Sequence, residues 1–162
     1  MRPHSAQGGS IRFLSREYHD TLGALKVTPP TSATLITLAG GVPSQLKAGA
    51  EQLARSLGRN LFRVNLGGIV SKYIGETEKN LAMLFARAQS TEWVLYFEDG
   101  DALFGRGGEG TGNQGLGPDS VSRIVEKLAV YRGFIVAVLR QPPQPAQAHR
   151  KIRHFHITFP PV

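Results

Sequence analysis

Three short stretches of the chain carry residue types that could bind phosphate or a metal ion. Residues 40–47 begin with two glycines and end with a lysine, Glu98 and Asp99 are adjacent carboxylates, and Arg140 is a single cation. Each stretch follows directly on an apolar run. In an open parallel sheet, ligands bind at the carboxyl ends of the strands. We therefore expect these groups to lie along one edge of a sheet.

The elements that must position these groups are apolar runs alternating with helical patterns. We predict five strands, at residues 34–38, 61–66, 93–97, 134–139 and 154–159. The helical patterns between them place apolar residues on one face, as Leu46, Ala50, Leu53, Ala54 and Leu57 show. Strands that are almost continuously apolar are typical of a parallel sheet covered by helices on both faces. The fold class is therefore predicted to be α/β, with a mainly parallel five-stranded sheet.

Length and composition limit the organisation of the chain. The 162 residues suit one core domain, which we place at residues 31–162. Residues 1–30 show little periodicity and end in two prolines, so we predict a partly ordered N-terminal arm with one short helix near residues 14–25. Cysteine is absent, which excludes disulfides and thiolate chemistry. No apolar run could span a bilayer and no secretory signal is present, so we expect a cytoplasmic protein without membrane partners.

The formal net charge of +7 favours an acidic partner, such as nucleic acid, a phosphate group or an acidic protein surface. The simpler interpretation is a solvated basic surface, because the basic residues are scattered until residues 149–156. That segment could contact nucleic acid, or it could be a sheet edge with solvated charges. His154 and His156 alternate and so share a face, but no third ligand is close in sequence and we expect no metal there.

Four segments resemble one known family, the AAA+ ATPases. Residues 71–81 read Ser-Lys-Tyr-Ile-Gly-Glu-Thr-Glu-Lys-Asn-Leu, close to the family signature SKY(I/V)GETEKNL. Residues 97–106 resemble the Walker B stretch FDEADALFGKR, and residues 131–133 resemble the lead-in to the sensor 1 strand. Residues 150–153 with 159–160 resemble the arginine-finger segment and the strand after it. The likeness keeps its order from residue 34 to 161 and is nearest to the AAA ATPases of phage-tail-like contractile injection systems.

The resemblance implies a three-layer αβα core like that of P-loop NTPases. It implies ATP and Mg²⁺ as cofactors, and a ring of identical or related subunits as the partners. Family members continue into a small helical lid after the last strand of the core. Because this sequence stops at Val162, we expect the lid to be absent.

The phosphate loop departs from the family pattern GPPGTGKT. Residues 40–47 read Gly-Gly-Val-Pro-Ser-Gln-Leu-Lys, so the residues left to contact ATP would be Gly40, Gly41, Ser44, Gln45 and Lys47. Pro43 lacks an N–H donor, and Leu46 stands where the phosphate-binding lysine belongs. Lys47, one residue later on a helix, would point about 100° away. We expect weak or absent ATP binding, with the helix N-terminus as the remaining anion site.

The acidic pair is reversed relative to the family. The resemblance gives Glu98 the position that orients Mg²⁺ and Asp99 the position that polarises the attacking water. Glu98 is one methylene longer, and Asp99 one methylene shorter, than the residue that the family has at that position. The pair is therefore either a slow or metal-binding site, or a remnant paired with Arg140 or Lys47. Arg140 occupies the sensor 1 position and could pair with Glu98 or Asp99.

Two further segments would act on other chains. Lys72, Tyr73, Ile74 and Gly75 resemble the loop with which AAA unfoldases grip peptide in a central pore, although Tyr73 could instead pack on its own domain. Arg150 aligns with an arginine that acts on the γ-phosphate of a neighbouring subunit.

Three hypotheses follow. The first is a degenerate AAA+ domain in protein remodelling or complex assembly, which contacts protein through Tyr73 and Ile74. The second is a slow ATPase that uses Lys47, Glu98 and Asp99. The third is a basic nucleic-acid-binding module.

Overall fold

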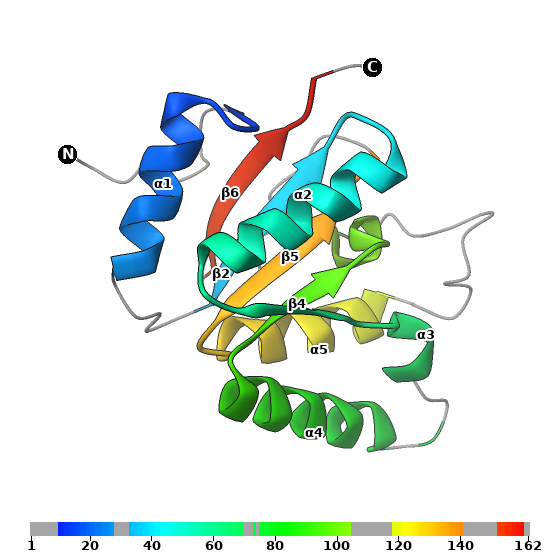
Figure 1. The fold of residues 1–162 in the computed structure, drawn as a ribbon. Coiled ribbons are helices and arrows are strands. Elements are labelled where there is room, and N and C mark those ends of the chain that lie inside the picture. The colour runs from blue at the N-terminus through cyan, green and yellow to red at the C-terminus, as the bar shows by residue number, and fades with distance from the viewer. Residues whose placement is uncertain are drawn as a thin grey trace.

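A computed structural model of the chain shows one parallel sheet with helices on both faces (Figure 1). The structure describes residues 10–27, 33–69, 73, 75–104, 118–140 and 152–160. Within them the strand order is β1 (Ile11–Arg12), β6 (Arg153–Thr158), β2 (Thr34–Ala39), β5 (Phe134–Val138), β4 (Trp93–Phe97) and β3 (Asn60–Arg63). All neighbouring strands pair in parallel. The predicted α/β class with a P-loop-NTPase-like core is confirmed.

The helices form the two outer layers of this core. Helices α1 (Arg16–Val27) and α2 (Pro43–Ser56) cover one face of the sheet, while α4 (Glu76–Thr91) and α5 (Pro118–Ala129) cover the other. Two short helices, α3 (Leu66–Ile69) and η1 (Gly100–Phe104), follow β3 and β4. Alternate side chains of a strand point to opposite faces, so Ile36 packs under α1 and α2 while Leu35 packs on the α4 and α5 side.

The sequence patterns located most strands to within one or two residues, with two differences. The strand predicted at residues 61–66 ends at Arg63, and Leu66 begins α3 instead. Leu66 and Ile69 are both buried, and their spacing of three residues suits one helical turn better than a strand. The sixth strand, β1, has two residues and is too short to produce a periodic pattern; it pairs Ile11 with Ile157.

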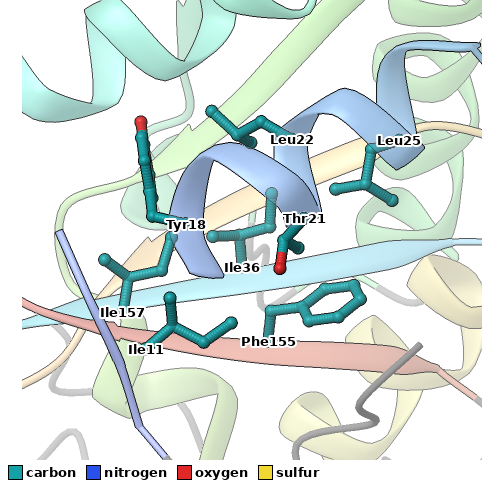
Figure 2. A pocket seen from close by; sticks show the side chains of 8 residues that line it. All are labelled: Ile11, Tyr18, Thr21, Leu22, Leu25, Ile36, Phe155 and Ile157. Atoms are coloured by element: carbon teal, nitrogen blue, oxygen red, sulfur yellow. The ribbon is translucent and has the colours of Figure 1, made fainter. Parts of the chain in front are cut away.

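Helix α1 packs against the edge of the sheet formed by β1, β6 and β2. Tyr18, Leu22 and Leu25 recur at helical spacing and are buried against these strands (Figure 2). The gap left between them is about 10 Å³ and apolar, so it is a packing defect that offers no ligand site. The division into an arm and a core at residue 30 stays a prediction, although α1 belongs to the same apolar cluster as β2 and α2. None of the described helices is both long and apolar enough to cross a membrane.

Candidate nucleotide and partner-contact site

The turn between β2 and α2 is held by the end of β6. Gly40 and Gly41 both have positive φ, 80° and 68°, a region that favours glycine. The Phe159 N–H donates to the Ala39 carbonyl oxygen at 2.8 Å. A Cβ atom added to Gly40 would lie 2.6 Å from the Phe159 carbonyl oxygen. The two glycines therefore let the turn approach the protein's own backbone closely.

The N–H groups at the start of α2 are largely bonded within the turn. The Gln45 side-chain Oε1 accepts a hydrogen bond from the Val42 N–H at 3.3 Å. The N–H groups of Gln45 and Leu46 both donate to the Val42 carbonyl oxygen, at 3.0 and 3.1 Å. Pro43 has no N–H to offer. A phosphate cradle needs several backbone N–H groups directed at the anion, and this turn uses those of Val42 and Gln45 in its own hydrogen bonds.

The side chains of residues 44–47 likewise differ from those of a phosphate site. Leu46 is 6% exposed and packs in the apolar cluster with Ala50 and Leu53. Ser44, Gln45 and Lys47 are exposed on the outside of the helix start. The position that should carry a lysine toward a polyphosphate is thus part of the core. The residues present do not fit ATP in the manner of the family's loop.

Glu98 forms an ion pair with a residue that the sequence patterns did not single out. Arg63 Nη2 lies 2.8 Å from Glu98 Oε2, and the two side chains are 67% and 41% exposed. The sequence offers Arg140 or Lys47 as a partner for the acidic pair, whereas the ion pair that Glu98 forms is with Arg63. Arg63 ends β3, the strand beside β4, so its cationic end lies at the same sheet edge as Glu98. The sequence offered no signal for this pair, because Arg63 stands inside the strand predicted at residues 61–66.

A polar pocket lies at the carboxyl ends of β3 and β4. Its volume is about 250 Å³, and its walls are Arg63, Val64, Asn65, Leu66, Phe97, Glu98 and Asp99. The nearby Tyr96 is buried, and this burial raises its pKa to about 12; the charge of Glu98 acts in the same direction and that of Arg63 opposes it. The acidic pair therefore sits with a cation in one partly open pocket.

Arg140 meets the acidic segment through its backbone. Its N–H donates to Asp101 Oδ2 at 2.8 Å, while its side chain is exposed. Asp101 is buried, and Gly100 beside it packs so closely on β5 that an added Cβ would lie 2.7 Å from the Val138 carbonyl oxygen. The structure thus brings the ends of β4 and β5 together through Asp101.

The segment that resembles a peptide-gripping loop is described only in part. Tyr73 is 63% exposed, and Gly75, with φ of 83°, precedes the first residue of α4. Lys72 and Ile74 lie outside the described residues, as do Arg150 and Lys151. The exposed ring of Tyr73 is accessible to another chain.

The described part of the basic segment is mostly internal. Strand β6 lies between β1 and β2, with Phe155 and His156 buried and Arg153 exposed. Thr37 Oγ1 lies 2.8 Å from His154 Nε2 and 2.7 Å from His156 Nδ1, so both imidazoles are hydrogen-bonded to one hydroxyl. Among the described residues, no group of three His, Cys, Asp or Glu side chains could hold a metal ion.

Comparison with known proteins identifies the family. Residues 48–151 match the sequence model of the ATPase family associated with various cellular activities (AAA), beginning directly after Lys47. An uncharacterised AAA family ATPase of Sinorhizobium fredii is 34% identical over 94 residues, which cover 54% of this chain and 27% of that protein. A proteasome-associated ATPase of Thermobifida fusca is 29% identical over 105 residues, covering 60% and 18%. One from Kineococcus radiotolerans is 30% identical over 95 residues, covering 54% and 16%.

The aligned region thus spans less than a third of each of these relatives. The family match itself covers more than half of this chain, and the parallel αβα core agrees with it. This chain belongs to the AAA family of ATPases.

Proposed function

We propose that this chain is a degenerate AAA+ domain that acts through contacts with protein partners and binds ATP weakly or not at all. The observation that carries the proposal is the turn at residues 42–46. There Gln45 accepts the Val42 N–H, and Leu46 is buried where a phosphate-binding lysine would have to reach outward. With the Val42 N–H bonded within the turn and no lysine at residue 46, a polyphosphate would find fewer favourable contacts here.

The partner is proposed to be protein. Two of the relatives are named as proteasome-associated ATPases. In this chain Tyr73 offers an exposed aromatic ring, which gives contact area to peptides of varied sequence. We further propose that the domain associates with copies of itself or with active AAA subunits in the cytoplasm.

Nucleotide binding is tested by thermal unfolding with ATP and Mg²⁺. A ligand that binds the native state raises the unfolding temperature in a concentration-dependent manner. We expect no shift at millimolar ATP. Lys47→Ala is the matched comparison, because it removes the exposed cation of this turn, and it should be as unresponsive to ATP as the natural chain. A saturable shift in the natural sequence would instead favour the slow ATPase that uses Lys47, Glu98 and Asp99.

Partner contact is tested with Tyr73→Ala and a fluorescently labelled unfolded model protein. We expect the variant to bind the labelled protein severalfold more weakly, because the aromatic side chain that contacts it is removed. Met83→Ala is the control, since Met83 on α4 is 64% exposed against 63% for Tyr73. Equal losses of affinity in both variants would count against peptide contact through Tyr73. A strict monomer by light scattering at high concentration would count against a ring of subunits.

A further inference from the structure

We propose that Arg63 is a built-in counter-ion for Glu98 and keeps a divalent cation from binding at this carboxylate. The inference rests on the proposed loss of nucleotide and metal binding, and it names a residue that causes part of that loss. Glu98 stands at the family's metal-orienting position, and in this chain its Oε2 atom is held by the Arg63 guanidinium at 2.8 Å.

Strand pairing places the guanidinium there. Arg63 ends β3 in register with Tyr96 of β4, and the next residue donates its backbone N–H to the Tyr96 carbonyl oxygen at 2.8 Å. Glu98 follows two residues after Tyr96. Strand pairing therefore brings the backbones of the two residues to neighbouring strand ends, and both residues line the 250 Å³ pocket.

The charge of Arg63 opposes cation binding in two ways. A divalent cation would have to displace the guanidinium from Oε2, and it would also be repelled by a positive charge a few ångströms away. Arg63 thus places a positive charge in the pocket that Glu98 and Asp99 line. Ion pairs as exposed as this one add little to stability, so the fold does not depend on Arg63.

The test measures Mn²⁺ binding without nucleotide, from the decrease of the free-ion electron paramagnetic resonance signal. We expect Arg63→Gln to bind Mn²⁺ at least about tenfold more tightly than the natural chain, because a nearby positive charge is removed. Arg63→Met keeps the aliphatic stem and should behave in the same way. The double variant Arg63→Gln with Glu98→Gln should lose the gain.

Arg87→Gln is the charge-matched control, because Arg87 is exposed on α4 and its loss changes the net charge equally. It should bind Mn²⁺ as the natural chain does. Unchanged Mn²⁺ affinity in both folded Arg63 variants, or an equal gain in Arg87→Gln, would overturn the proposal. Because ATP is absent from this experiment, its result is separate from the thermal test of nucleotide binding.

Discussion

The ring of Phe159 lies over Gly49 in the middle of α2. A Cβ atom at Gly49 would overlap the Phe159 ring, and that ring stacks on Phe13 at a centroid distance of 4.2 Å and an interplanar angle of 16°. The same Phe159 backbone lies against Gly40. One aromatic residue therefore joins the end of β6, the residue after β1, helix α2 and the phosphate-loop turn.

We predict that Gly49→Ala destabilises the fold. Alanine is the better helix former by about 1 kcal/mol, but forcing a methyl group against a packed ring costs roughly 1–3 kcal/mol. Gly23→Ala in α1 is the matched control, because nothing lies within 4 Å of an added Cβ there. That variant should gain about 0.5–1 kcal/mol. Urea denaturation distinguishes the two, and a stabilised Gly49→Ala would contradict the packing described.

Two buried tyrosines should respond oppositely to loss of the hydroxyl. The Tyr18 hydroxyl is buried without a hydrogen-bond partner among the described residues, and burial raises the pKa of Tyr18 to about 12. The Tyr131 hydroxyl donates to the Trp93 carbonyl oxygen at 3.3 Å. Removing an unsatisfied buried polar atom is favourable, so Tyr18→Phe should raise the free energy of unfolding by about 1 kcal/mol. Tyr131→Phe should lower it by a similar amount, and the reverse order in denaturation would refute this.

Neighbouring positions at the start of α2 should differ sharply in their contribution to stability. Leu46 is in the core while Lys47 is exposed. Leu46→Ala should cost about 2–4 kcal/mol through the cavity it leaves. Lys47→Ala should stay within about 0.5 kcal/mol of the natural chain. Comparable losses at both positions would show that Leu46 does not lie in the core.

Stability should fall on mild acidification because of His156. Burial lowers the pKa of His156 below its ordinary value of 6.5, and its Nδ1 is hydrogen-bonded to Thr37 at 2.7 Å. Below pH 6.5 the His156 imidazole therefore binds a proton more readily in the unfolded chain than in the folded chain. The contribution to stability is complete above about pH 6.5 and is lost as the pH falls toward the lowered folded-state pKa.

The measurement is the free energy of unfolding between pH 5 and 8. His156→Gln should flatten the decrease below pH 6.5, whereas His19→Gln, at an exposed position of α1, should retain it. An unchanged pH slope in His156→Gln would assign the decrease to other groups.

Local patterns were enough to predict much of the fold. The alternation of apolar runs with helical faces predicted the parallel sheet, because strands buried on both faces must be apolar throughout. The same patterns failed at β1, where two residues are held by pairing with β6. They also failed at residues 64–66, because β3 ends at Arg63 and Leu66 begins α3.

For the candidate site, too, the sequence determined some features and the tertiary structure decided others. The sequence by itself determined which residue types stand at positions 40–47, 98 and 99, and therefore that a lysine and two loop glycines are replaced. Only the tertiary structure decided that Phe159 packs on Gly40 and that Glu98 pairs with Arg63, whereas the bond from Val42 to Gln45 is local. The first two contacts join residues distant along the chain, and strand order in the sheet brings them together. Arg63 and Phe159 meet their partners because the backbone hydrogen bonds of the sheet decide which strands are neighbours.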